Sequence, residues 1–138
     1  MKVEVKWIED LKFVGKADKK QEIIFGAGDS TIVSPMEMVL MAAGGCSSVD
    51  VVDGLKSAGQ RVTDCRAKLT TERRDTAPRL FTQIHIHFQV SGEALDPAIV
   101  SQVTADSLEK YCSVCLMLGQ GVEMRHSWEI VTTDTASA

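Results

Sequence analysis

The sequence lacks a surplus of positive charge. Its 138 residues carry 15 Lys and Arg against 19 Asp and Glu, which gives a formal net charge of -4. A protein that binds nucleic acid needs a basic surface to neutralise phosphates. The local cluster Glu72–Arg74, together with Arg79, is too small to provide one. The charge balance therefore argues against nucleic acid as a main partner.

The sequence also lacks a membrane-length apolar run and a leader segment. A transmembrane helix needs about 20 apolar residues, whereas the apolar stretch Met36–Cys46 is shorter and contains Glu37. The first residues, Met1–Asp10, read as a strand instead of a charged-then-apolar leader. No internal repeat, low-complexity segment or linker occurs. We expect a single domain over residues 1–138, in the cytoplasm and without a membrane partner.

The hydrophobic pattern predicts an α+β fold. Strand-like alternation occurs in three short segments near the start, two long segments in the middle and one at the end. Two helices separate these groups, one from Ser34 to about Lys56 and one from Asp96 to about Leu118. This order favours antiparallel pairing over alternating βαβ units. The expected strands lie at 2–8, 11–17, 20–25, 61–74, 81–90 and 122–131.

The first helix has a clear beginning and an unusual first half. Ser34 is the expected N-cap, Pro35 takes the first helical position, and Glu37 completes a capping box. Gly59 suits the end of the helix. The first half is apolar on every side, which predicts a helix enclosed by its own domain or by a second subunit.

Four cysteines occur in the sequence, and a chain of this size needs no disulfide framework. We expect reduced thiols whose function would be catalytic, redox or metal-binding. Cys65 lies on the apolar side of a predicted strand and is expected in the core. Cys46 lies within the first helix after two glycines. Those glycines allow close packing or leave room for a substrate, and the residues alone do not decide which.

Cys112 and Cys115 form a C-x-x-C pair in the second predicted helix. A redox dithiol normally opens a helix, but this pair is expected near a helix C-terminus, where the dipole opposes a thiolate. A zinc site would need further ligands, and His85 with His87 is the available pair. An exposed polar strand face is the favoured account of both histidines.

Four stretches of the sequence resemble a known protein family. They are "SPMEMVLMAAGGCSSVDVV", "SLEKYCSVCLML", "ERR" and "APRLFT". They resemble the OsmC/Ohr family of osmotically induced and organic hydroperoxide resistance proteins, and most of all its YhfA-type branch. The resemblance implies an intertwined homodimer in which antiparallel sheets wrap around two central helices.

The resemblance also implies a thiol-dependent peroxidase that uses Cys46 and Cys112. The Cys46 thiolate would attack a hydroperoxide and become a sulfenic acid, and Cys112 would resolve it as a disulfide. A dithiol, typically a lipoylated protein, would reduce that disulfide. No metal or other cofactor is implied, and an apolar pocket would favour organic hydroperoxides. Cys115 has no counterpart in the family's reactive pair.

The sequence departs from the family pattern at the groups that hold the thiolate. Met36 follows Pro35 where a glutamate is expected, Glu37 comes one residue later, and no arginine precedes Arg61. The weak candidates for a stabilising group are Glu37, which capping already explains, and the turn arginines, which also read as a solvated hairpin end. Those arginines are Arg73, Arg74 and Arg79.

These departures leave a second hypothesis open. The chain would then be a non-catalytic protein on the same scaffold, which senses oxidation or binds a small apolar ligand. Sustained turnover of peroxide with a dithiol would favour the peroxidase, whereas disulfide formation without turnover would favour the sensor.

Overall fold

A computed structural model of the chain describes residues 1–132, so positions 133–138 of the expected domain lie outside the described residues. It divides into a first unit, Met1–Met41, and a second unit that begins at Ala42. The strands are β1 (Val3–Glu9), β2 (Lys12–Ala17), β3 (Glu22–Gly26), β4 (Arg61–Arg73), β5 (Phe81–Glu93) and β6 (Glu123–Ile130). The helices are α1 (Pro35–Ser57), α2 (Pro97–Asp106), the π-helix η1 (Ser107–Tyr111) and α3 (Ser113–Leu118).

The first unit contains an antiparallel sheet in the order β1-β2-β3, as expected from its alternating residues. The register places Trp7 opposite Phe13, and Phe13 opposite Phe25, whose ring stacks on that of Phe13 at a centroid distance of 6.3 Å. Every residue of β1 is exposed, including Val3 and Trp7. This sheet therefore presents apolar side chains that the described chain does not cover.

Helix α1 begins where the sequence predicts. The backbone N–H of Ser34 donates to Glu37 Oε1 at 2.9 Å, and the N–H of Glu37 donates to Ser34 Oγ at 3.1 Å, which is a complete capping box. Gly59 follows the helix with a φ of +78°, a left-handed conformation that favours glycine. Both predicted ends of the helix are confirmed.

The expectation that the chain has no apolar segment of membrane length was wrong, because α1 is longer than the stretch considered. Within residues 1–132 it is the one helix that is long and apolar enough, by length and composition, to cross a membrane. Counting only Met36–Cys46 was too narrow, because the helix continues to Ser57. The core helix of a soluble protein passes the same test, and Ala43, Val51 and Leu55 of α1 are fully buried within this chain.

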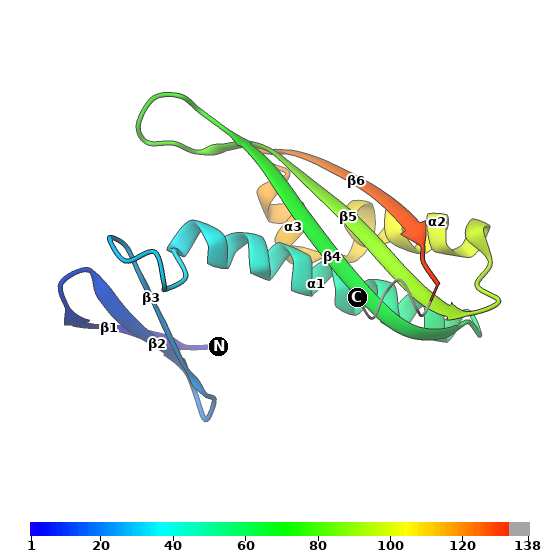
Figure 1. Ribbon diagram of the computed structural model, residues 1–138, viewed down its shortest axis with the longest axis horizontal. Helices are drawn as coiled ribbons and strands as arrows, with labels where there is room; N and C mark the ends of the chain where they lie inside the picture. Colours follow the sequence, from blue (N-terminus) through cyan, green and yellow to red (C-terminus); the bar gives the residue numbers. More distant parts are fainter. Residues whose placement is uncertain (133–138) are drawn as a thin grey trace. The chain divides into compact units, whose positions relative to one another are not determined.

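The second unit contains the core, beneath a sheet in the order β4-β5-β6 (Figure 1). On β5 the side chains of Ile84, Ile86, Phe88 and Val90 are fully buried, and the residues between them lie on the other face. Strands β4 and β5 pair antiparallel, but β5 and β6 pair parallel. The expectation of antiparallel pairing was wrong for that pair, because the helical segment between them is a crossover connection.

The second helical segment is not the single helix that the sequence predicts. It begins at its expected cap, where Asp96 Oδ1 accepts from the N–H of Ala98 at 2.9 Å. Helix α2 then continues into η1, the chain becomes extended at Cys112, and α3 starts at Ser113. The prediction of a continuous helix to Leu118 was therefore wrong. The α+β class is confirmed.

Candidate thiol site

Cys46 lies on α1, and one side of this helix is buried in the second unit. The buried residues Ala43, Ser47 and Val51 lie on the side of α1 that faces the core. Gly44 belongs to that side too, because a Cβ added there would lie 2.8 Å from Leu69 Cδ1 of β4. Close packing therefore explains the first glycine of the pair.

The second glycine has a different environment. A Cβ added at Gly45 would meet no atom within 4 Å, so this position faces open space in the described chain. Cys46 itself is half-buried. The sequence left close packing and substrate space as alternatives. Close packing accounts for Gly44, and substrate space beside Gly45 stays a prediction.

Cys112 lies at the break in the second helical segment. Its backbone is extended, with φ -73° and ψ 104°, and its N–H donates to the Ser107 carbonyl oxygen at 2.7 Å, the i→i−5 bond that closes the π-helix. Its Sγ accepts a hydrogen bond from the N–H of Cys115 at 3.3 Å, so Cys112 is the N-cap of α3. The side chain is fully buried.

Three thiols meet at this break. The Cys46 and Cys115 thiols both lie near enough to Cys112 to raise the pKa of its thiol. The Cys115 thiol also donates to the Ala43 carbonyl oxygen, with 3.9 Å from Sγ to O. The structure thus brings Cys46 and Cys112 together, as the resemblance implied, and adds Cys115 to the cluster.

Burial dominates the acidity of two of these thiols. It raises the pKa of Cys112 far above the ordinary thiol value. The hydrogen bond from the Cys115 N–H lowers this pKa, while the Cys115 and Cys46 thiols raise it further. Burial also raises the pKa of Cys115, and the charges of Cys46 and Asp50 raise it further. Within the described chain no arginine or lysine is among the groups that shift these two pKa values.

Asp50 is the carboxylate among the groups that raise the pKa of Cys115. The Ser107 hydroxyl lies 3.2 Å from Asp50 Oδ2 and 3.1 Å from the Ser47 carbonyl oxygen, and it ties η1 to α1. Cys115 also borders a hollow of about 590 Å³, which Leu116, Met124 and His126 line as well.

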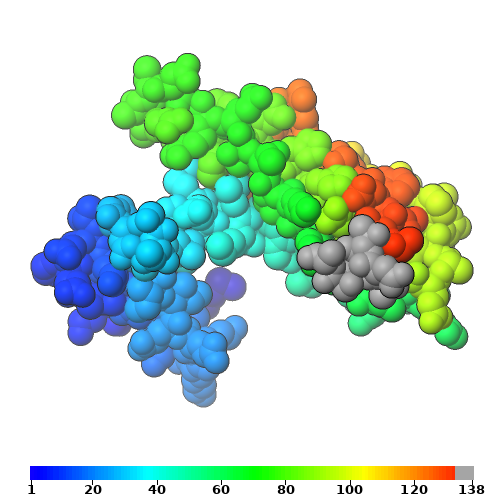
Figure 2. Space-filling model, in the orientation of Figure 1, coloured from blue at the N-terminus to red at the C-terminus, as the bar shows by residue number. Residues whose placement is uncertain are grey.

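The turn arginines hold the β4–β5 hairpin tip together. Arg73 Nε donates to the Arg79 carbonyl oxygen at 2.9 Å, and Arg79 Nε donates to the Arg74 carbonyl oxygen at 3.1 Å. The guanidinium of Arg73 also lies over the Phe81 ring, 5.5 Å from its centroid. The tip is exposed and projects from the second unit (Figure 2). In the described chain these contacts give the arginines a structural role in the turn.

Glu37 lies in the capping box, where hydrogen bonds from the backbone and side chain of Ser34 lower the pKa of its carboxyl group. Its side chain is exposed. The capping that the sequence analysis offered as an explanation of this residue is therefore present.

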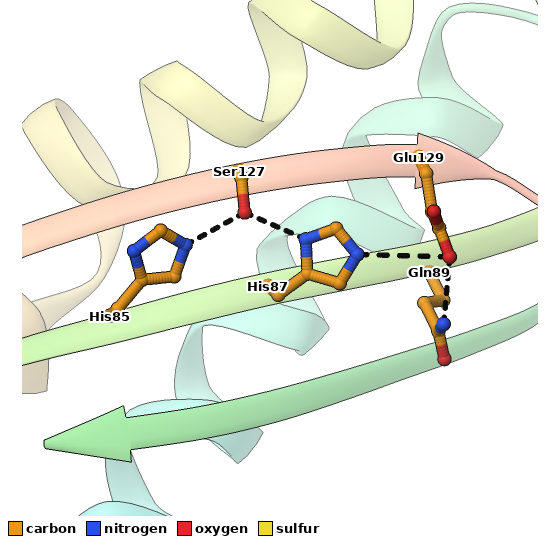
Figure 3. Close-up of polar contacts among 5 residues, drawn as sticks. All are labelled: His85, His87, Gln89, Ser127 and Glu129. Atoms are coloured by element: carbon orange, nitrogen blue, oxygen red, sulfur yellow. Dashed lines mark hydrogen bonds and ion pairs between the residues drawn. The ribbon is translucent and has the colours of Figure 1, made fainter.

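His85 and His87 are half-buried and share a hydroxyl group as their partner. His85 Nε2 and His87 Nδ1 each lie 2.7 Å from the Ser127 hydroxyl, and His87 Nε2 lies 3.7 Å from Glu129 Oε1 (Figure 3). Gln89 completes this row by donating to Glu129 at 2.7 Å. No group of three or more His, Cys, Asp or Glu side chains within residues 1–132 could hold a metal ion, so the zinc hypothesis finds no ligand set there.

Cys65 stands apart from the thiol cluster. It is half-buried on β4, burial raises its pKa, and a hydrogen bond with Ser48 of α1 acts against that rise. The expectation that Cys65 lies in the core is met only in part, because its side chain is half-buried and not fully enclosed. What the sequence analysis missed was Cys115, although the C-x-x-C spacing was the signal that could have located a helix start there.

Comparison with known proteins finds sequence relatives of this chain. A family model described as "OsmC-like protein" matches residues 27–127. Protein YhfA of Escherichia coli strain K12 is 51% identical to this chain over 132 residues, which cover 95% of this chain and 98% of that protein.

Solved structures give two further matches. A hypothetical protein from Aquifex aeolicus VF5 is 31% identical with a TM-score of 0.86, covering 95% of this chain and 96% of that chain. An organic hydroperoxide resistance protein from Elizabethkingia anophelis has a TM-score of 0.72 at 11% identity, covering 95% and 97% of the two chains. At 11% identity the likeness shows the shared fold alone.

Proposed function

The chain belongs to the OsmC-like family, and on this premise we propose that it is a thiol-dependent peroxidase that reduces organic hydroperoxides in oxidative stress defence. The observation that supports this function is the proximity of Cys46 on α1 to Cys112 at the start of α3, where Cys46 raises the pKa of the Cys112 thiol. A nucleophilic thiol and a resolving thiol must be able to meet, and this proximity favours that role for the pair.

The chemistry proceeds in three balanced steps. The Cys46 thiolate attacks one oxygen of the hydroperoxide, the O–O bond breaks, and the other oxygen leaves as the alcohol. The resulting sulfenic acid condenses with the Cys112 thiol, forms a disulfide and releases water. An external dithiol then reduces the disulfide by exchange. A lipoylated protein is the proposed reductant, and no metal or cofactor is needed.

The surface beside Cys46 supports an organic substrate. Ala42 and Val49 stand four residues before and three residues after Cys46, which places them on the same side of α1. Both are exposed in the described chain, and Gly45 opens onto free space. A small, apolar surface next to a half-buried sulfur favours an alkyl hydroperoxide over hydrogen peroxide.

The partner that completes the site is proposed to be a second copy of the chain. Apolar side chains remain exposed in both units, with Val3 at 73% and Trp7 at 61% in one, and Val49 at 68% and Met117 at 69% in the other. An exposed apolar surface of this kind is typical of an interface. We propose that residues 1–138 form one domain of an intertwined homodimer in the cytoplasm, without nucleic acid or membrane partners.

The dimer would also supply the cation that the thiol cluster lacks. A thiolate in apolar surroundings needs a positive group nearby, and none in the described chain shifts the pKa values of Cys112 and Cys115. The exposed hairpin tip carries Arg73, Arg74 and Arg79, of which we propose Arg79 as the first candidate. Glu37 is an anion and cannot be that cation. It is a weaker candidate for a group that orients the arginine at the thiolate, because it already serves in the capping box.

The raised pKa of the Cys112 thiol favours a second function. Because burial raises the pKa of Cys112, exchange at that sulfur is slow. A slow thiol pair suits a non-catalytic protein that registers oxidation or binds a small ligand. The two functions differ in whether the disulfide is recycled.

The test is turnover of cumene hydroperoxide with dihydrolipoamide as the reductant. We expect sustained turnover in the wild type, none in Cys46→Ser, and wild-type turnover in Cys65→Ser, which changes a thiol outside the cluster. Hydrogen peroxide should be consumed more slowly than cumene hydroperoxide. A wild type that forms a Cys46–Cys112 disulfide but does not turn over would support the sensor instead.

A further inference from the structure

The C-x-x-C pair opens a helix in this structure. The sequence predicts Cys112 and Cys115 far along a continuous helix, a position that argues against a redox dithiol. The break at Cys112 removes that objection, because α3 begins at the next residue. Cys112 Sγ accepts a hydrogen bond from the backbone N–H of Cys115 at 3.3 Å, and the Cys115 thiol lies near enough to raise the pKa of Cys112.

Cys112 is therefore the shared neighbour of two thiols. Cys46 reaches it from α1, and Cys115 reaches it from the first turn of α3. Cys112 and Cys115 are both buried, at 0% and 1% exposure, whereas Cys46 is half-buried. A disulfide between Cys46 and Cys112 would thus form beside a third sulfur that no solvent reaches.

We propose that Cys115 is a second resolving thiol, which takes over the disulfide from Cys46 and leaves a Cys112–Cys115 disulfide. This inference rests on the proposed function, because peroxide must first generate the Cys46–Cys112 disulfide. In the exchange the Cys115 sulfur attacks Cys112 Sγ, and the bond between Cys112 and Cys46 breaks. The electron pair leaves on the Cys46 sulfur, which takes up the proton that Cys115 loses. No further oxidant or reductant is consumed.

The start of α3 places the two cysteines side by side. Cys112 is the extended N-cap, and its Sγ lies 3.3 Å from the backbone nitrogen of Cys115, the residue that carries the attacking thiol. A disulfide needs Cβ atoms about 3.5–4.5 Å apart, so the exchange requires the two side chains to rotate toward each other. Because both sulfurs are buried, the external dithiol reduces the cluster through Cys46, which reverses the exchange and exposes the bond again.

The exchange restores a free thiol at Cys46 while the cluster is still oxidised. That thiol can react with a second hydroperoxide and become a sulfenic acid. One chain therefore consumes two equivalents of hydroperoxide before any reductant is added. Without Cys115 the first disulfide retains Cys46, and consumption stops after one equivalent.

The exchange is expected to accelerate as pH rises. Burial raises the pKa of Cys115, so only a small thiolate fraction attacks at neutral pH. The charge of Cys46, which raises this pKa further, disappears once Cys46 is in a disulfide, although the hydrogen bond from the Cys112 thiol is lost at the same time. A higher pH increases the attacking thiolate in either case.

The test is a disulfide map after oxidation with one equivalent of cumene hydroperoxide, acid quench, alkylation and trypsin digestion. Cys46 falls in the peptide 21–56, and Cys112 and Cys115 fall together in the peptide 111–125. We expect the wild type to contain an internal disulfide in 111–125 and an alkylated Cys46. Cys115→Ser and Cys115→Ala should instead link 21–56 to 111–125, and Cys65→Ser should match the wild type.

The disulfide map of the wild type tests the role of Cys115 even if a variant fails to fold. If 21–56 linked to 111–125 is its main product and one equivalent of hydroperoxide is consumed, the role of Cys115 is wrong while the proposed peroxidase stands. If no disulfide forms at all and turnover is absent, the proposed function itself fails. Two equivalents consumed, with a dimedone adduct on 21–56 after the second, would support the role of Cys115.

Discussion

The two segments that carry the clustered thiols are built in opposite ways. Helix α1 is unbroken over 23 residues, and Cys46 lies near its middle. The second segment changes from an α-helix to a π-helix, becomes extended at Cys112 and then forms a new helix of six residues. One thiol lies within an uninterrupted helix, and the other lies at a local interruption.

The comparison shows how a break in a helix can place one thiol beside two others. In a regular helix the side chain of Cys46 points to one side, and its contact with Cys112 follows from the packing of α1. The extended backbone at Cys112 turns its sulfur toward the start of α3, where it accepts the Cys115 N–H. The interruption therefore makes Cys112 the centre of the cluster, and the predictions below test that arrangement.

The largest effect is expected from removing the central thiol. Cys112→Ser should reduce dithiol-dependent turnover by more than about tenfold, equivalent to about 1.4 kcal/mol in the activation barrier, because the Cys46 sulfenic acid loses its resolving partner. Cys115→Ser should retain turnover, since Cys112 remains. Steady-state assays compare the two variants, and equal losses would remove the distinction between them.

A pH dependence of stability comes next. The folded state holds the protons of Cys112 and Cys115 more tightly than the unfolded state, because burial raises both pKa values. Stability is thus unaffected by these thiols below the unfolded pKa of about 8.5 and falls as pH rises above it, by at most about 1.4 kcal/mol per pH unit for each thiol.

Urea unfolding of the reduced protein between pH 7 and 10 measures this dependence. The double variant Cys112→Ser/Cys115→Ser should have a shallower fall in the free energy of unfolding. An unchanged slope in the double variant would mean that these two thiols do not retain their protons in the folded state.

Replacing the adjacent glycines of α1 one at a time is expected to change stability by a smaller amount. Gly45→Ala should stabilise the chain by about 1 kcal/mol, because alanine favours a helix and the position is open. Gly44→Ala should gain less, since Leu69 must move. Thermal or urea unfolding measures both. If Gly45→Ala instead weakens a dimer seen by ultracentrifugation, a second copy packs against that glycine.

The smallest effect is expected at Glu37. Glu37→Gln preserves a side chain that can accept the Ser34 N–H, so the capping box survives. We expect turnover within about twofold of the wild type, a difference of about 0.4 kcal/mol. A loss of turnover without a loss of stability would instead assign Glu37 a role at the thiolate.

The sequence predicted the parts of the fold that local patterns determine. The capping box at Ser34 and the alternation on β5 each depend on neighbouring residues, and both are confirmed. The parallel pairing of β5 with β6 depends on where a 29-residue connection returns the chain, between Glu93 and Glu123, and that pattern is not local.

The thiol site was predictable only in part. The resemblance identified Cys46 and Cys112, and the structure brings them into contact. The role of Cys115 depends on the break at Cys112, and no proline or glycine interrupts the residues from Ala98 to Leu118 to signal it. The break is stabilised by the Ser107 carbonyl and by the link from Ser107 to Asp50 and Ser47, which are tertiary features.

The central claim is that the Cys46 sulfur attacks the peroxide bond. The most direct measurement is dimedone trapping of sulfenic acid in the Cys112→Ser/Cys115→Ser variant, which leaves Cys46 without a resolving thiol. After one equivalent of cumene hydroperoxide, we predict an adduct on Cys46 in the peptide 21–56 and none on Cys65 in the peptide 62–66. An adduct on Cys65, or none on Cys46, would contradict the account.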